Sequence, residues 1–275
     1  MDYAEITYAA GDRNATITLD RPEARNGYTV RMSDELADAF GRADEDEDED
    51  VRVVVFTGAG EHFRAGAGLT QGGGFDLGES AWQEPAGRCS KRIHEMNKPV
   101  IAAIRGAAVG AGLTITLLAD YRLAATDAKF GLVFTRRGMF PEGGSAWYLP
   151  RLVGMGRALD WMISGRIFGA EEAKSAGLVH QVHEPGEVLD KAYELAREIA
   201  ATTSPGSVAV TRQLLYHLAS ADSPYPAHEL DSRLTALLPT HSDAVEGVAS
   251  FLQKRSPGFP LRVDRDLPSF LPWTD

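Results

Sequence analysis

The 275-residue sequence has one cysteine, Cys89, and no hydrophobic run long enough to cross a bilayer. One cysteine cannot form a disulfide within the chain, and it leaves no cysteine-based zinc cluster to consider. A membrane-spanning helix needs about 20 apolar residues, and the opening residues MDYAEITYAAGDRN lack both the basic and the apolar part of a signal peptide. These absences predict a cytoplasmic protein that spans no membrane and binds no metal ion.

Basic residues are also scarce. The chain has 28 Lys and Arg against 39 Asp and Glu, a net charge of -11 at pH 7. Because affinity for nucleic acid comes largely from Lys and Arg that neutralise phosphates, we expect no nucleic-acid partner. Residues 44–50 form an unbroken acidic run, which predicts a solvated helix end or loop. Any anionic ligand therefore needs a local basic pocket.

Several nucleotide-binding and hydrolase motifs are missing. Residues 51–60, VRVVVFTGAG, could begin a dinucleotide-binding loop, but Phe63 occupies the position of its third glycine. The chain has no P-loop, and Ser145 lies in GGSAW rather than in the G-x-S-x-G of α/β-hydrolases. His180 and His183 are three residues apart on a predicted strand, so they point to opposite faces and do not form a metal site.

What the chain does contain is a succession of strands, loops and helices. From Pro185 onward it is almost entirely helical, with breaks at Ser204-Pro205, at Ser223-Pro224 and around His241. This order predicts a mixed α/β fold with a core over residues 1–200 and a helical region over 201–275. The elements expected before residue 185 are a β-hairpin over 5–10 and 14–20, a helix after residue 29, strands at 51–60, 99–104 and 121–125, a helix at about 110–118, a loop at 139–154, and a helix at about 156–164.

The tetrapeptide GAGL occurs twice, at 66–69 and 110–113, and each copy follows a strand of similar character. Repeats separated by 20 to 50 residues are typical of successive turns of one supersecondary unit, so we expect the two copies to stack side by side. The second copy begins a helix, where unpaired N–H groups favour negative charge. The backbone N–H groups of Ala67 and Ala111 would then face one point and form an oxyanion hole.

Seven phrases in a fixed order extend this pattern over nearly the whole chain. They resemble the crotonase superfamily, also called the enoyl-CoA hydratase/isomerase family. The phrases are LDRPEARN (19–26), VRVVVFTGAGEHFRAGAGL (51–69), KPVIAAIRGAAVGAGL (98–113), ADYRLAATDAKFG (119–131), LPRLVG (149–154), AEEAKSAGLV (170–179) and EGVASFLQKRSPGF (246–259).

The resemblance implies a crotonase-like spiral of ββα units and C-terminal helices that mediate assembly into a homotrimer or a hexamer. It also implies an acyl-CoA substrate, with coenzyme A as part of the substrate and no other cofactor. In such enzymes two backbone N–H groups stabilise an enolate, and their positions match Ala67 and Ala111. For coenzyme A, the resemblance points to the loop at Ala65 and Gly66 with Gly110 opposite. The basic residues expected near its phosphates are Arg25, Arg64 and Lys254.

Two departures from the family pattern bear on the reaction. Hydratases of the family use two glutamates to deliver water and a proton, and the matching positions here are Thr114 and Phe134. Neither side chain can act as a carboxylate base, and each general acid or base contributes roughly 100-fold to 10,000-fold to the rate. Efficient hydration by the usual mechanism is therefore not expected.

Glu142 is the remaining carboxylate that matches a catalytic position, since isomerase-like and dehalogenase-like relatives carry an aspartate there. We expect its pKa to be raised by an apolar pocket that includes Phe134, Met139 and Phe140. The alternative is that Glu142 caps the helix beginning in GGSAW. Arg136 and Arg137 adjoin the loop and are either partners of Glu142 or solvated. Reserve candidates for the acid/base are Asp76, Glu84 and His94.

Three functions remain open at this point. The first is an enoyl-CoA hydratase/isomerase-family enzyme that moves a proton on an acyl-CoA through Glu142. The second keeps the fold but performs C–C bond hydrolysis or another enolate reaction. The third is a catalytically silent acyl-CoA-binding protein, because both hydratase glutamates are missing.

Overall fold

The structure is a computed structural model that describes residues 3–45, 50–65 and 84–273. It contains the predicted hairpin, in which β1 (Ile6–Gly11) pairs antiparallel with β2 (Asn14–Leu19). Asp12 and Arg13 form the turn with φ of 50° and 61°. The hairpin forms one edge of the larger of two sheets.

The larger sheet has the strand order β1-β2-β3-β4-β6-β9 and is parallel from β2 onward. The smaller sheet has the order β5-β7-β8. Strand β6 has the bounds that the sequence predicts. The remaining strands are β3 (Val53–Gly58), β4 (Val100–Ile104), β6 (Tyr121–Ala125), β9 (Gln181–His183), β5 (Ala107–Val109), β7 (Lys129–Gly131) and β8 (Ile167–Gly169).

The chain visits the two sheets in turn, which produces a spiral. Strand β4 leads into β5, and β6 leads into β7, so each turn contributes one strand to each sheet. The turn that starts with β3 reaches the smaller sheet at Arg64, which bridges in parallel to Ala108. These two residues are 44 positions apart, the spacing of the GAGL repeat. The expected spiral of strand–strand–helix units is therefore confirmed.

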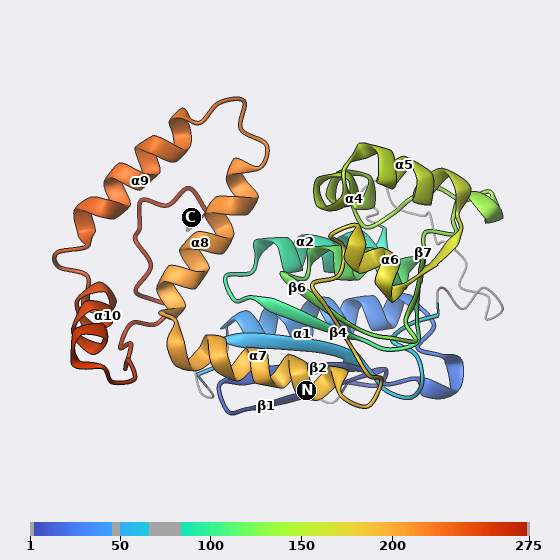
Figure 1. Cartoon of the computed structure of the whole chain (residues 1–275), viewed down its shortest axis with the longest axis horizontal. Helices are drawn as coiled ribbons and strands as arrows, with labels where there is room; N and C mark the ends of the chain where they lie inside the picture. The colour runs from blue at the N-terminus through green and yellow to red at the C-terminus, as the bar shows by residue number, and fades with distance from the viewer. Residues whose placement is uncertain (1–2, 46–49, 66–83, 274–275) are drawn as a thin grey trace.

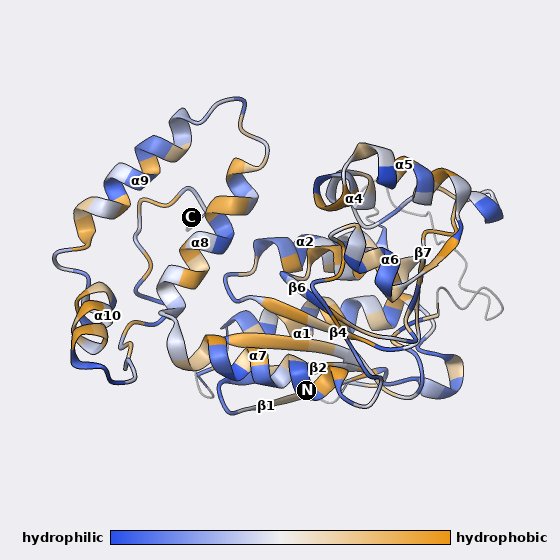
Figure 2. Ribbon diagram, in the orientation of Figure 1, coloured by the Kyte–Doolittle hydropathy of each residue, from blue (hydrophilic) through white to orange (hydrophobic). Residues whose placement is uncertain are grey.

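Helices cover both faces of the larger sheet. On one face, α1 (Val30–Glu45) and α2 (Pro85–Glu95) pack over side chains such as Val54 and Phe56. On the other face, α7 (Val188–Thr202) packs over alternate residues of the same strands. Figure 1 shows α1 and α7 on either side of the strands, and Figure 2 shows the strands as a hydrophobic band between them. Burial on both faces accounts for the nearly continuous apolar runs of β3 and β4.

Shorter helices surround the smaller sheet. The helix expected at 110–118 is split into α3 (Ala111–Thr114) and the 3-10 helix η2 (Ile115–Leu118). The loop expected at 139–154 is wrong in its second half, because the residues there form a helix, α4 (Ser145–Val153). The next helix is α5 (Met155–Ser164). Gly143 and Gly144, with φ of 63° and 69°, form the turn that starts α4, and Gly154 separates the two helices. Helix α6 (Ala170–Ser175) follows β8.

The helical C-terminal region is present, with breaks where the sequence places them. Its helices are α8 (Pro205–Leu218), α9 (Tyr225–Leu237) and α10 (Ser242–Gln253). Figure 1 shows α9 and α10 standing away from the sheets, and α9 contains no buried residue. Within the described part of the chain, no helix is long and apolar enough to cross a membrane.

Candidate active site

Asn26 holds the segment that follows β3 against the loop that follows β2. Its buried Nδ2 donates to the carbonyl oxygens of Ala59, His62 and Phe63 at 2.9 to 3.1 Å. The neighbouring Arg25 carbonyl accepts the N–H of Ala65 at 3.1 Å. Arg25 and Ala65 are therefore brought together as the sequence analysis expected, and the Arg25 side chain is exposed.

The second predicted oxyanion donor lies at the start of α3. Gly110 precedes it with φ of 59°, and the Gly110 N–H donates to the Gly131 carbonyl at 2.8 Å. Among the described residues, no acceptor lies within hydrogen-bond geometry of the Ala111 N–H, so it is free to bind a ligand oxygen. Gly66 and Ala67 lie outside the described residues, so the first donor stays a prediction.

A close backbone approach joins the two turns beneath α3. The Arg64 carbonyl accepts the N–H of Val109 at 3.0 Å. A Cβ at Gly112 would lie 2.5 Å from that same carbonyl oxygen, a distance that no side chain tolerates. Glycine at position 112 is therefore needed for Arg64 and Ala111 to sit on adjacent turns.

Glu142 faces α3 rather than the helix that follows it. The Thr114 hydroxyl donates to Glu142 Oε1 at 2.5 Å. The N-cap of α4 is Gly144, and no side chain caps that helix. The helix-capping role considered for Glu142 is therefore wrong. Thr114 instead orients the Glu142 carboxylate through this hydrogen bond.

The pKa of Glu142 is raised to about 7, mainly by burial and to a smaller extent by the nearby charge of Glu84, although the Thr114 hydrogen bond and Arg64 act to lower it. The expected rise in pKa is thus confirmed. The expected lining is only partly right: Phe134 is buried, Met139 is partly buried, and Phe140 is 87% exposed. Phe140 turns outward because it precedes Pro141 in an irregular segment, where no strand or helix directs its ring inward.

Glu84 lies next to Glu142 in the site, although the sequence indicates it only as a reserve candidate for the acid/base. Its Oε1 accepts the N–H of Gly143 at 2.7 Å, which ties the start of α2 to the Glu142 turn. Of the other reserve residues, His94 bonds the Tyr148 hydroxyl at 3.0 Å, and Asp76 lies outside the described residues. An acid just before the helix-starting Pro85 is the only sequence signal for Glu84.

The structure separates the remaining basic candidates. Arg136 and Arg137 are exposed and bind the carbonyls of Ser164 and Val133, so neither is a partner of Glu142. Arg64 is fully buried, which does not suit a contact with the solvated phosphates of coenzyme A. Lys254 follows α10, which stands away from the sheets in Figure 1, so the chain does not bring it next to Arg25.

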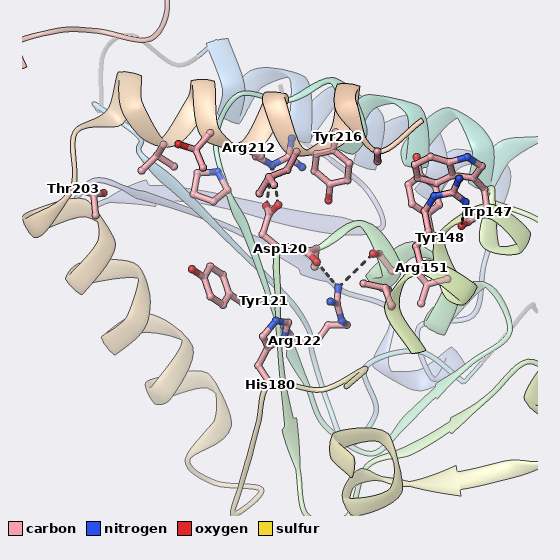
Figure 3. Close-up of a pocket in the computed structure, with 18 of the residues that line it drawn as sticks. Asp120, Tyr121, Arg122, Trp147, Tyr148, Arg151, His180, Thr203, Arg212 and Tyr216 are labelled. Carbon is pink, nitrogen blue, oxygen red and sulfur yellow. Dashed lines mark hydrogen bonds and ion pairs between the residues drawn. The ribbon is translucent and has the colours of Figure 1, made fainter. Parts of the chain in front are cut away.

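A cavity of about 930 Å³ lies between α8, α4 and the start of β6, apart from the α3 site. Arg212 and Asp120 both line it, with Arg212 Nε 3.0 Å from Asp120 Oδ2, and Figure 3 shows the two side chains pointing toward each other. Arg122 lies below them and donates to the carbonyls of Thr116 and Leu178. Neither Glu142 nor Ala111 lines this cavity, and its buried arginines already have partners, so we place the chemistry at α3.

A spiral of strand–strand–helix turns, in which one short helix begins at Ala111 and holds a buried carboxyl group through Thr114, is an architecture of the crotonase type. Comparison with known proteins agrees. Residues 12–261 match the sequence profile described as "Enoyl-CoA hydratase/isomerase". The chain belongs to the enoyl-CoA hydratase/isomerase family, within the crotonase superfamily.

Three relatives show the range of similarity. The enoyl-CoA hydratase ACTT3 of Alternaria alternata is 39% identical over 251 residues, which cover 90% of this chain and 83% of that protein. The 1,2-epoxyphenylacetyl-CoA isomerase of Escherichia coli K12 is 34% identical over 252 residues, with coverage of 89% and 94%. The crystal structure of an enoyl-CoA hydratase from Polaromonas sp. JS666 superposes with a TM-score of 0.83 at 30% identity, covering 93% and 99%.

Proposed function

We propose that the protein moves a proton on an acyl-CoA thioester, with the enolate held by the N–H groups of Ala67 and Ala111 and with Glu142 as the single acid/base. The observation that carries this proposal is the arrangement of α3. One turn of that helix begins at Ala111 and ends at Thr114, whose hydroxyl holds the Glu142 carboxylate at 2.5 Å. The oxyanion donor and the base are thereby fixed to one rigid element.

The proposed reaction uses both protonation states of Glu142. The carboxylate removes a proton from the carbon next to the thioester carbonyl, or from the carbon beyond a double bond conjugated with that carbonyl, and the electron pair moves onto the carbonyl oxygen. The two N–H groups stabilise the resulting enolate, and Glu142 returns the proton to a different carbon. A pKa of about 7 suits this shuttle, because the base and the acid are both present at neutral pH.

Fast hydration is not part of the proposal. Phe134 is apolar, and the Thr114 hydroxyl is engaged with Glu142, so neither residue supplies a second carboxylate to activate water. The C–C hydrolase and the silent acyl-CoA-binding protein remain the competing functions, and they differ from the proposal in whether coenzyme A is needed and whether a proton moves.

The proposed coenzyme A contacts are Arg25, Ala65, Gly66, Gly110 and Lys254. Arg25 and Ala65 are joined through the backbone, which makes the 65–66 loop the proposed place for the adenine. Lys254 can approach that loop from the α10 of another copy, since its own α10 lies away from the core. The exposed side chains of Val248, Phe251 and Leu252 support such an assembly.

We therefore also propose a homotrimer or a hexamer formed through the C-terminal region. A cytoplasmic location and a role in fatty acid metabolism remain predictions from the sequence.

Deuterium exchange into a simple saturated thioester tests the proposed chemistry. The protein is incubated with butyryl-CoA in D2O, and mass spectrometry follows the isotope content of the acyl group. Enzyme-dependent gain of deuterium at the carbon next to the carbonyl is the expected result. Binding without exchange, for butyryl-CoA and 3-enoyl-CoA thioesters alike, would identify a silent binder, and absence of binding would favour a substrate that lacks coenzyme A.

A further inference from the structure

Arg64 is a buried charge without a polar partner. Its relative exposure is 0%, and its Nε and both Nη atoms have no hydrogen-bond partner among the described residues. Its guanidinium instead lies over the ring of Tyr28, 4.0 Å from the ring centroid. A contact with an aromatic ring offsets only part of the cost of removing a guanidinium from water.

Two other buried arginines of the chain show what a structural guanidinium looks like in this fold. Arg212 binds the Asp120 carboxylate at 3.0 Å and the carbonyl of Ile93 at 2.7 Å. Arg122 donates to the carbonyls of Leu178 and Thr116 at 2.6 and 3.0 Å. Each of these side chains ties loops together through hydrogen bonds. The Arg64 guanidinium connects no loops through hydrogen bonds, so a structural role does not explain why a charged side chain is buried at this position.

The acids whose charges act on Arg64 or on its neighbourhood are already engaged. Glu142 accepts the Thr114 hydroxyl at 2.5 Å, and Glu84 accepts the Gly143 N–H at 2.7 Å. Glu5 accepts the hydroxyl of Thr29 and lies 3.5 Å from Arg21. None of them is within ion-pair distance of Arg64. The guanidinium therefore carries a positive charge that no described residue meets with a hydrogen bond or an ion pair.

The position of Arg64 indicates which part of a substrate would reach it. Its backbone immediately precedes Ala65 and pairs with the strand that leads into Gly110 and Ala111. Its burial separates it from the solvated phosphates of coenzyme A. The hydroxyl of Ser90, which is 4% exposed and has no partner among the described residues, faces the Gly143 turn of the same site. The charges of Arg64 and Glu142 act on each other, so the guanidinium lies on the Glu142 side of the site, where the Ser90 hydroxyl also lacks a partner among the described residues.

We infer that Arg64 binds a carboxylate on the acyl group, so that the substrate is an acyl-CoA with a second acidic group. This inference rests on the proposed function, because it assumes that an acyl-CoA occupies the α3 site. A guanidinium presents parallel N–H donors that match the two oxygens of a carboxylate, and pairing inside a buried site restores the hydrogen bonds that Arg64 lacks. The arginine acts as a specificity residue and takes no part in proton transfer.

The test compares acyl-CoA thioesters of equal carbon number with and without the acid. Calorimetry gives the Kd of malonyl-CoA against propionyl-CoA, of succinyl-CoA against butyryl-CoA, and of glutaryl-CoA against valeryl-CoA. We expect the wild type to prefer the acidic member of at least one pair by about tenfold or more, the value of a charged hydrogen bond. Arg64→Met should abolish that preference while leaving the Kd of the neutral member within a few-fold. Arg197→Met, at an exposed arginine of α7, is the control and should keep the preference.

The melting temperature Tm without ligand distinguishes a binding role of Arg64 from a structural one. Arg64→Met should leave Tm unchanged or raise it, because the guanidinium has no hydrogen bonds to lose, whereas Arg122→Met should lower Tm. A preference of less than threefold in all three pairs, or a fall in Tm for Arg64→Met that equals that of Arg122→Met, would overturn the inference. Failure of both members of every pair to bind would instead refute the acyl-CoA site itself.

Discussion

Replacement of Glu142 by glutamine removes proton transfer and little else. Glutamine has nearly the same volume, and its Oε1 can still accept the Thr114 hydroxyl now bound at 2.5 Å. We therefore expect the Kd of butyryl-CoA to stay within a few-fold and the rate of deuterium exchange to fall by at least about 100-fold. Glu198→Gln, at an exposed glutamate of α7, makes the same chemical change outside the site and should leave the rate unchanged.

The same substitution has a stability signature that follows from the pKa. Burial raises the pKa of Glu142 from 4.5 to about 7, so the folded protein holds this proton at pH values where the unfolded chain has released it. The stabilisation that comes from the protonated carboxyl is present below pH 4.5 and is lost as the pH rises through 7. Relative to wild type, Glu142→Gln should gain about 3 kcal/mol of unfolding free energy between pH 4.5 and pH 8.

Exchange rates and urea unfolding at several pH values measure both effects. A variant that exchanges deuterium at the wild-type rate would show that Glu142 is not the base. An unfolding free-energy difference that does not change with pH would show that the carboxyl ionises as freely in the folded protein as in the unfolded chain. The first result would refute the catalytic role of Glu142, and the second would refute the reasoning from burial.

Three further outcomes are expected. Thr114→Val removes the hydrogen bond that lowers the pKa of Glu142, so the midpoint of the pH–rate profile should move upward from about 7, and an unchanged midpoint would contradict the contact. Crotonyl-CoA should bind but be hydrated slowly, and hydration at the rate of two-glutamate relatives under matched conditions would contradict the assignment of Thr114 and Phe134. Sedimentation at micromolar protein should show a trimer or a hexamer. Phe251→Asp should weaken this assembly, because the Phe251 side chain is 81% exposed in the single chain, and a 29.7 kDa monomer in the wild type would refute the assembly.

The succession of elements could be predicted from the sequence because it depends on local chemistry. Strand β6 has the predicted bounds, and the break before α8 follows from Ser204, whose hydroxyl accepts the N–H of Ser207, and from Pro205 at the first helical position. The GAGL spacing anticipated the stacking of turns, since Arg64 and Ala108 pair at the same separation. Such signals lie within a few residues of the feature that they determine.

The environment of each candidate side chain was decided only by the tertiary structure. The sequence suggests Arg64 near the coenzyme A phosphates and Phe140 inside a pocket, yet Arg64 is fully buried and Phe140 is exposed. Glu142 could cap the helix beside it or face α3, and the contact with Thr114, 28 residues earlier, determines which. Glu84 reaches the Gly143 turn across 59 residues of chain. The burial of a side chain and its hydrogen-bond partners depend on which distant elements pack together, and local residue patterns do not determine that packing.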